Sequence, residues 1–339
     1  MLKRKDIQEI QSLLSKKSRI VITTHYNPDG DAMGSCLGLY HYLISLKHTV
    51  NIITPNSWPS FLDWMPGSDT CIAGNKQLKK AEKIIAQADI IFSLDYNTLK
   101  RTEELAPYIE SAKAVKILID HHIQPDSFAR YTFSDTKASS TCQMVFDFIK
   151  ALSPDITLNK DCATCLYTGI MTDTGSFKFR STTAHTHYIV SELLKCGINN
   201  TEIHENVLDN NTYERMRLLG FSLCEKLTVL NEYHTAFIAL SSDELNSFGF
   251  KKGDTEGFVN YALSILDIKF SALFLELENG IKISFRSKGR FDVNTFARKY
   301  FNGGGHLNAA GGSSDLTLDE TILKFVSLLP KHKKDLSKK

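Results

Sequence analysis

Carboxylate and imidazole side chains gather in four short segments in the first half of the chain. The segments read THYNPDGDAMGS, FSLD, ILIDHH and GIMTDTGSF, and each follows or ends an apolar run. Their acidic and imidazole residues are His25, Asp29, Asp31, Asp95, Asp120, His121, His122 and Asp173. Carboxylates and imidazoles together suit Mn²⁺ better than a metal that prefers thiolates. The set is large enough for a two-metal centre with a bridging carboxylate, which would activate water and stabilise the leaving oxygen of a phosphoryl transfer.

Each segment taken alone also has a structural explanation. An aspartate in a polar turn can simply cap the next helix, and this applies to Asp29, Asp95 and Asp173. Gly34 and Ser35 are expected at the start of a helix, where free backbone N–H groups could hold a phosphate. The adjacent histidines of ILIDHH are poorly suited to a core, so one is expected to bind metal and the other phosphate.

A second group of residues, near the end of the chain, suits an anion. Residues 301–312 read FNGGGHLNAAGG, and three consecutive glycines could expose backbone N–H groups as a phosphate nest. A flexible hinge would explain the same glycines. His306 is expected at the start of a helix-like stretch. Arg286, in SFRSKGR, could pair with phosphate through both of its guanidinium N–H groups, or it could be a solvated residue at a strand end, as could Lys288 and Arg290.

The elements that must position the first group alternate in type. Short apolar runs at 19–25, 49–54, 88–95 and 114–120 predict strands, and a helical pattern covers 32–47. This βαβ order is typical of a parallel sheet. Because ligands bind beyond the carboxyl ends of strands in such sheets, strands that end in Asp or His predict a site as well as a fold.

The second half of the chain has a different pattern. Residues 184–226 show long helical patterns and no clear strand. After them the sequence predicts a smaller mixed α+β domain, whose expected strands are 234–241, 270–277 and 280–287 and whose expected helices lie near 254–266 and 292–300. The final basic run, KHKKDLSKK, predicts a solvated, disordered end.

Length and charge limit the class of protein. The chain has 339 residues, which predicts two domains. Lys and Arg total 40 and Asp and Glu total 38, and this balance argues against a protein that coats long duplex nucleic acid. The sequence has no signal-peptide pattern and no apolar run long enough for a membrane span, and its seven cysteines are predicted to be reduced thiols. Cys162 and Cys165 are expected to be buried structural residues. These features predict a cytoplasmic protein.

The motifs, in their order and at their separations, resemble those of the DHH-family phosphoesterases, in particular the nanoRNase and pAp-phosphatase branch. The resemblance covers nearly the whole chain. Four segments resemble the family's catalytic motifs: HYNPDGDAMGS, SLD at 93–95, DHH at 120–122 and TDTGSF at 172–177. Two others resemble its DHH-associated C-terminal domain: SFRSKG at 284–289 and GGGHLNAAGG at 303–312. The family fold implied is a Rossmann-like parallel-sheet catalytic domain over 1–190, a helical linker over 191–228 and a mixed α+β substrate-binding domain over 229–339.

The resemblance also implies roles for individual residues. His25 and Asp29 would bind one metal ion. The other ion would be bound by Asp31, His121 and Asp173. Asp95 would bridge the two ions, and the catalytic set is Asp95, Asp120 and His122. In that set, His122 lies beside the scissile phosphate and Asp120 orients the histidines. The ions are expected to be Mn²⁺, with Mg²⁺ or Co²⁺ as alternatives because these metals accept overlapping ligands.

On the substrate side, the resemblance implies that five residues hold the nucleotide and its far phosphate: Arg286, Gly303, Gly304, Gly305 and His306. The small hydroxyl residues Ser139–Thr141, Ser140 among them, are expected to contact the substrate. The implied substrates are short oligoribonucleotides, hydrolysed to mononucleotides, and 3′-phosphoadenosine 5′-phosphate (pAp).

Alternatives for the same centre are a phosphodiesterase of linear pApA-type dinucleotides, a single-strand exonuclease, and a pyrophosphatase or exopolyphosphatase. A nucleotide-sensing protein with a degenerate site is a different class, and the complete ligand set argues against it. A homodimer is the general expectation, although the sequence shows no interface signature.

Overall fold

The computed structural model describes residues 4–337. The chain divides into two compact units, one ending at Asn210 and the other beginning at Asn211. Each unit has its own sheet and its own hydrophobic core. The division falls between helices α8 (Asn200–Leu208) and α9 (Tyr213–Cys224), inside the segment 191–228 for which a helical linker is expected.

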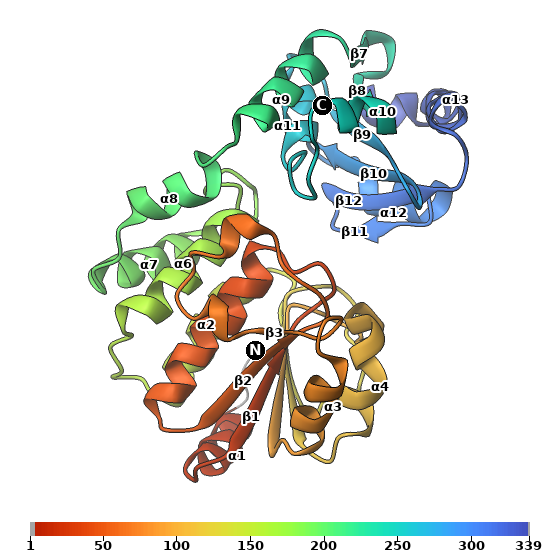
Figure 1. Ribbon diagram of the computed structural model, residues 1–339. Helices are drawn as coiled ribbons and strands as arrows, with labels where there is room; N and C mark the ends of the chain where they lie inside the picture. The colour runs from red at the N-terminus through yellow and green to blue at the C-terminus, as the bar shows by residue number, and fades with distance from the viewer. Residues whose placement is uncertain (1–3, 338–339) are drawn as a thin grey trace. The chain divides into compact units, whose positions relative to one another are not determined.

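The first unit is built on a six-stranded sheet in which every pair of neighbouring strands is parallel (Figure 1). Its strands are β1 (Arg19–Thr23), β2 (Thr49–Thr54), β3 (Ile72–Ala73), β4 (Ile90–Leu94), β5 (Val115–Asp120) and β6 (Tyr131–Ser134). Their order in the sheet is β3-β2-β1-β4-β5-β6. The predicted parallel sheet is confirmed, and the four predicted apolar runs form β1, β2, β4 and β5. The strands β3 and β6 were not predicted from the sequence.

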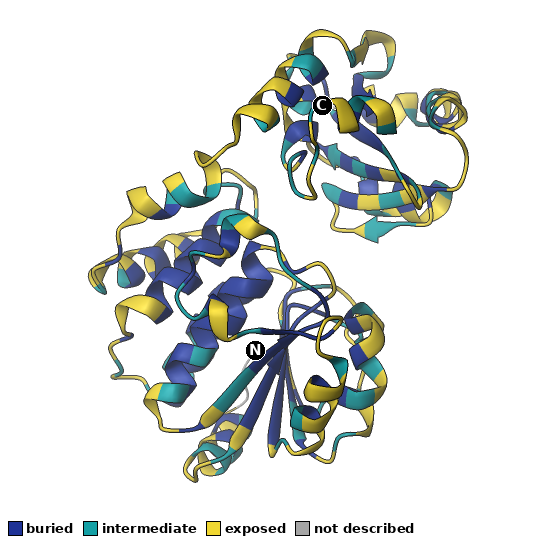
Figure 2. Ribbon diagram, viewed as in Figure 1, coloured by how far each residue is buried: buried dark blue, intermediate teal, exposed yellow. Residues whose placement is uncertain are grey.

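Helices cover both faces of this sheet. They are α1 (Arg4–Leu14), α2 (Gly30–Ser45), α3 (Leu78–Ala86), α4 (Ala106–Ser111), α5 (Thr141–Leu152), α6 (Lys160–Asp173), α7 (Ala184–Lys195) and α8 (Asn200–Leu208), with short 3₁₀ turns η1 (Ser60–Leu62), η2 (Ser68–Thr70) and η3 (Leu99–Leu105). Side chains alternate between the faces along β1: Ile20 and Ile22 join the larger core, and Val21 joins the smaller core under α3 and α4. Strands β1, β2 and β5 are more deeply buried toward their carboxyl ends than at their starts (Figure 2).

Glycines allow α2 and α6 to approach each other closely beneath the site. A Cβ atom on Gly34 would lie 2.6 Å from the Cys165 carbonyl oxygen, and a Cβ atom on Gly169 would lie 3.1 Å from the Cα atom of Asp31. The cysteines of this region, among them Cys162 and Cys165, are buried free thiols, as predicted. Gly34 and Ser35 are themselves buried inside α2, which begins at Gly30 with Asp29 as its cap. The expectation that they open the helix and hold a phosphate is therefore wrong.

Replacing Gly34 with alanine is expected to destabilise the protein by about 1–3 kcal/mol, because the neighbouring atom is backbone and cannot rotate away. The measurement is the urea midpoint of unfolding. The control is Gly220→Ala, since Gly220 lies on an exposed helix turn where an added Cβ atom would meet nothing within 4 Å. That change is expected to be neutral or to stabilise by up to about 1 kcal/mol. Equal midpoints for the two variants would contradict the close packing of α2 against α6.

The second unit contains a six-stranded mixed sheet, in agreement with the predicted α+β character. Its strands are β7 (Leu227–Leu230), β8 (Thr235–Leu240), β9 (Phe270–Leu277), β10 (Gly280–Ser287), β11 (Gly304–Gly305) and β12 (Ala309–Ser314). Their order is β11-β12-β10-β9-β8-β7, with β8 and β9 parallel and the other pairs antiparallel. Its helices are α9 (Tyr213–Cys224), α10 (Ser242–Ser247), α11 (Phe258–Ser264), α12 (Val293–Tyr300) and α13 (Leu318–Ser337), with the 3₁₀ turn η4 (Asn231–Tyr233).

Two local predictions about this unit are wrong. Residues 301–312 form a hairpin, in which Gly304 pairs with Gly311, so His306 lies in the turn between β11 and β12 and not at the start of a helix. The basic C-terminal run is helical as far as Ser337, because α13 buries Phe325, Leu329 and Leu336 completely. Lys338 and Lys339, the last residues of that run, lie outside the described residues.

Candidate metal centre

Neighbouring strand ends bring the predicted residues of the first unit together. His25 follows β1, Asp95 follows β4, and Asp120 is the last residue of β5. Because β1, β4 and β5 are adjacent and parallel, these three positions lie at one edge of the sheet. Two helices complete the group: Asp29 caps α2, and Asp173 is the last residue of α6.

One group of ligand atoms consists of His25, Asp29 and Asp95, all within 4.8 Å of one another. His25 Nε2 lies 3.3 Å from Asp95 Oδ2 and 4.0 Å from Asp29 Oδ1. The other ring nitrogen, Nδ1, donates to the Tyr26 carbonyl oxygen at 2.8 Å. This hydrogen bond leaves the lone pair of the neutral ring on Nε2, the atom that faces the carboxylates, which is the usual arrangement for a metal-binding histidine.

A second group consists of Asp31, His121 and Asp173. His121 Nε2 lies 3.6 Å from Asp173 Oδ2 and 3.9 Å from Asp31 Oδ2. The same nitrogen is 3.6 Å from Asp95 Oδ1. Asp95 therefore faces both groups, with one carboxylate oxygen toward His25 and the other toward His121.

The electrostatics of this cluster are those of crowded, buried charges. Burial and the neighbouring carboxylates of Asp95 and Asp173 raise the pKa of Asp31 well above its ordinary value. Burial likewise raises the pKa of Asp173 to about 7, although the charge of His121 opposes the shift. For Asp95, the effect of burial is outweighed by the hydrogen bond that His25 donates when its ring is protonated and by the charge of the nearby imidazoles, so its pKa is lowered. Oxygen and imidazole donors that crowd negative charge in a buried site fit divalent metal ions, which would neutralise the carboxylates.

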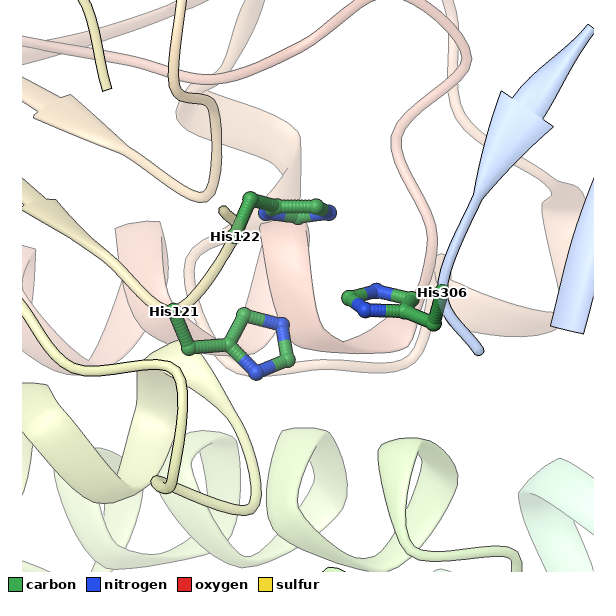
Figure 3. A group of neighbouring side chains, drawn as sticks. All are labelled: His121, His122 and His306. Carbon is green, nitrogen blue, oxygen red and sulfur yellow. The ribbon is translucent and has the colours of Figure 1, made fainter. Parts of the chain in front are cut away.

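Asp120 and His122 form a tight pair beside these groups. The carboxylate of Asp120, which is completely buried, accepts from His122 Nδ1 at 2.7 Å and from the His122 backbone N–H at 3.1 Å. The rings of His121 and His122 meet edge to face, with their centroids 4.9 Å apart, and both leave the end of β5 (Figure 3). Asp120 thus fixes the orientation of the His122 ring and keeps the proton of a neutral ring on Nδ1.

The carbonyl oxygen of Asp95 contacts Arg101, a residue that no motif in the sequence indicated. Asp95 has a left-handed φ of 64°, which is unusual for a residue other than glycine. Arg101 donates from Nη1 to the Asp95 carbonyl oxygen at 3.4 Å, and its own carbonyl oxygen accepts from the Tyr26 N–H at 2.6 Å. Arg101 therefore links the loop that carries His25 to the loop that carries Asp95.

Ser140 is completely buried and caps α5, where its hydroxyl accepts from the Gln143 N–H at 3.0 Å. Ser139 is also buried and donates to the Gln143 side chain at 2.7 Å. Both serines therefore stabilise the start of α5 through their hydrogen bonds to Gln143. The expected substrate contact of Ser140 stays a prediction.

The candidate substrate residues of the second unit lie around β10 and the β11–β12 hairpin. Arg286 is half-buried on β10 and donates to the Phe285 carbonyl oxygen at 3.0 Å. His306, the third side chain drawn in Figure 3, is an exposed residue of the hairpin turn. Lys288 and Arg290 are exposed beyond the end of β10. Whether these residues bind substrate stays a prediction.

The expected nest of free N–H groups at the three glycines is wrong for two of them. The N–H of Gly303 donates to the Ala297 carbonyl oxygen at 3.3 Å, and that of Gly305 donates to Asn294 Oδ1 at 2.9 Å. Asn294 also accepts from Arg298 Nε at 3.0 Å. The α12 residues Asn294 and Arg298 thus adjoin the glycine segment, and neither was predicted from the sequence.

The fold and the site define a class of α/β proteins. In this class, carboxylates and histidines suited to metal ions meet at the carboxyl ends of the strands of a parallel sheet. Two protein-family models match the chain: "DHH family, N-terminal domain" over residues 19–170 and "DHHA1 domain" over residues 231–329. The chain therefore belongs to the DHH family.

Proteins from several bacteria are similar to this chain in sequence over most of their length. The chain is 31% identical to the "Bifunctional oligoribonuclease and PAP phosphatase NrnA" of Thermus thermophilus, over 89% of this chain and 86% of that protein. It is 29% identical to the Bacillus subtilis protein of the same name, over 90% of this chain and 92% of that protein. Among solved structures, it is similar to "an exopolyphosphatase-related protein from Bacteroides Fragilis", with 41% identity, a TM-score of 0.96 and coverage of 99% and 98% of the two chains. Within residues 4–337, no helix is both long and apolar enough to cross a bilayer.

Proposed function

We propose that the protein is a metal-dependent phosphoesterase that hydrolyses short oligoribonucleotides to mononucleotides and pAp to AMP. The observation that carries the proposal is the Asp95 carboxylate, whose two oxygens lie 3.3 Å from His25 and 3.6 Å from His121. A carboxylate shared between two ligand groups is suited to a pair of metal ions. The names of the Thermus and Bacillus relatives support the choice of substrates.

The proposed metals are two Mn²⁺ ions. His25 and Asp29 would hold one ion, Asp31, His121 and Asp173 would hold the other, and Asp95 would contact both. Divalent ions held there supply the Lewis acidity and the activated water that phosphoester hydrolysis needs.

The remaining residues of the centre bind and orient. His122, whose Nδ1 is fixed by Asp120 at 2.7 Å, would present the rest of its ring to the scissile phosphate. Asp120 is the last residue of the buried strand β5, and its hydrogen bond fixes the His122 ring. The ring therefore needs little reorganisation when substrate binds. In the second unit, Arg286, His306 and the glycine segment would bind the nucleotide and a further phosphate, where the planar guanidinium matches phosphate geometry.

A cytoplasmic location is part of the proposal. All seven cysteines are free, and thiols of this kind persist in a reducing compartment.

The test is a substrate panel assayed with Mn²⁺: pAp, linear pApA, RNAs from dinucleotide length upward, single-stranded DNA, pyrophosphate and polyphosphate. The highest kcat/KM is expected for pAp and the shortest RNAs, with a decline as the RNA lengthens. Protein carrying Asp95→Asn, purified in the same way, measures contaminating phosphatase. Faster hydrolysis of long single-stranded DNA than of short RNA would overturn the proposed substrate class.

A second candidate function is hydrolysis of pyrophosphate or polyphosphate at the same centre. The similarity to the exopolyphosphatase-related protein, at 41% identity, favours it. The same panel separates the two functions, because a kcat/KM for pyrophosphate or polyphosphate far above that for every nucleotide would establish the second candidate and exclude the first.

A further inference from the structure

The first turn of α5 hydrogen-bonds to two carboxylates of the metal centre. The backbone N–H groups of Thr141 and Cys142 donate to the two oxygens of Asp31, at 2.6 Å and 2.9 Å. The Thr141 hydroxyl donates to Asp95 Oδ1 at 2.9 Å. Thr141, Asp31 and Asp95 are all buried, so water does not compete for these bonds. One helix end thus contacts carboxylates that belong to both ligand groups.

This helix end is itself rigidly supported. Ser140 occupies the third N–H of the turn, that of Gln143, which leaves the first two for Asp31. The Gln143 side chain in turn accepts from Ser139 Oγ at 2.7 Å and from Thr186 Oγ1 at 2.9 Å. Since Thr186 belongs to α7, two helices and the loop before α5 fix the position of these donors.

The Thr141 hydroxyl has a different effect from the backbone donors. Asp31 receives two N–H bonds and cannot turn without losing both. Asp95 directs Oδ2 toward His25 and Oδ1 toward His121, and a partial rotation about its terminal bond would move both oxygens out of line with these histidines. The hydroxyl of Thr141 is a donor aimed at Oδ1, and it therefore favours the one orientation that serves both groups.

We propose that Thr141 is a positioning residue for the metal centre, whose hydroxyl orients the Asp95 carboxylate so that it can serve both metal ions. The inference rests on the proposed function only for the metal ions themselves, not for the identity of the substrate. Thr141 acts through Asp95 and touches no reacting atom. From the sequence, this residue is expected only as part of a segment that contacts substrate.

The test is Mn²⁺ binding in the absence of substrate, measured by the electron paramagnetic resonance signal of free Mn²⁺ during a titration. Thr141→Val keeps the size of the side chain and the backbone N–H to Asp31 but removes the hydroxyl. It is expected to weaken Mn²⁺ binding by about 10–100-fold, as is typical when an outer partner of a metal ligand is lost. Thr141→Ser keeps the hydroxyl and is expected to bind within a few-fold of the wild type.

The matched control is Thr168→Val. Thr168 is a completely buried threonine of α6 whose hydroxyl donates to the Thr164 carbonyl oxygen at 2.8 Å, and within residues 4–337 it makes no hydrogen bond to a carboxylate or histidine of the centre. This variant loses a buried hydroxyl in the same unit and is expected to bind Mn²⁺ like the wild type. Equal weakening in Thr168→Val and Thr141→Val would show a general effect of core disruption and would overturn the proposal.

Other outcomes are equally decisive. If Thr141→Val binds Mn²⁺ as tightly as the wild type, or if Thr141→Ser binds as weakly as Thr141→Val, the hydroxyl does not position Asp95 and the proposal is wrong. If Thr141→Val does not fold, as judged by circular dichroism, Thr141→Ala replaces it and must again bind more weakly than Thr141→Ser. A protein that shows this pattern of Mn²⁺ binding but hydrolyses no nucleotide would support the inference while the proposed substrates fail.

Discussion

Replacement of Asp95 by asparagine is expected to lower turnover by well over 100-fold, beyond the roughly 10–100-fold cost of losing an outer partner of a metal ligand. Asparagine keeps the shape of the side chain and can still accept from Thr141 through its amide oxygen. It removes the negative charge from the residue that lies 3.3 Å from His25 and 3.6 Å from His121. An amide nitrogen on either side would also present hydrogen atoms where a metal ligand must present lone pairs.

The measurement is single-turnover hydrolysis of pAp at saturating Mn²⁺, which separates the chemical step from product release. The matched control is Asp147→Asn, because Asp147 also pairs with a histidine, His185, at 2.9 Å, but lies on α5 outside the centre. That variant is expected to stay within a few-fold of the wild type. Activity of the Asp95 variant within ten-fold of the wild type would contradict its assignment as a residue shared by two metal ions.

Much of this centre could be predicted because of one property of parallel sheets. His25, Asp95 and Asp120 each follow or end a β-rich apolar run in the sequence. Strands that run in the same direction end at the same edge, so the pattern of residues along the chain already places these side chains together. The sequence could not show that β1, β4 and β5 would be adjacent, since strand order depends on the tertiary packing of helices that link them.

Thr141 and Arg101, which contact the residues of the centre, could not be predicted from the sequence for a related reason. Thr141 contacts Asp95 across 46 positions of the chain, and its backbone N–H contacts Asp31 across 110. A threonine at the start of a helix has an ordinary local explanation as part of a cap, so nothing in its neighbourhood indicates a distant carboxylate. Arg101 is similar, because its carbonyl oxygen accepts from the N–H of Tyr26, which lies in the loop after another strand of the sheet.

In the second unit, local propensity predicts the wrong structure at two places. The alanines after His306 favour a helix, but pairing of the segment with β10 and with Gly304–Gly305 makes it a strand. Close approach of the hairpin backbones excludes a side chain at Gly303, whose Cβ atom would collide with the Gly311 carbonyl oxygen. At the C-terminus, the many basic residues led to the prediction of a disordered end. The segment is instead an amphipathic helix that buries Phe325, Leu329 and Leu336 in the core of the unit.

A change from about pH 8 to about pH 6 is expected to weaken Mn²⁺ binding by at least ten-fold, because several ligands must lose a proton before they bind metal. Burial raises the pKa of Asp173 to about 7, so this carboxyl becomes protonated within that range. The pKa values of His25 and His121 are also raised, since the nearby carboxylates outweigh the effect of burial. All three shifts act in the same direction, and each proton that must be released weakens binding by up to about ten-fold per pH unit.

The thermal stability of the protein should depend on these same protons. The metal-free protein should lose the contribution of Asp173 as the pH rises, whereas the stabilisation by Mn²⁺ should increase. In metal-free protein, the raised pKa of Asp173 favours the folded state at low pH, and this contribution is lost as the pH rises from the unfolded value of about 4 through about 7. Bound Mn²⁺ replaces those protons, so the rise in Tm on adding Mn²⁺ should be larger at about pH 8 than at about pH 6. Differential scanning calorimetry with and without Mn²⁺ measures this difference, and calorimetric titration in buffers of different ionisation enthalpy counts the protons released.

Asp173→Asn should bind Mn²⁺ more weakly and with a shallower pH dependence. A Tm increment that is the same at both pH values would contradict the coupling of metal binding to these buried groups.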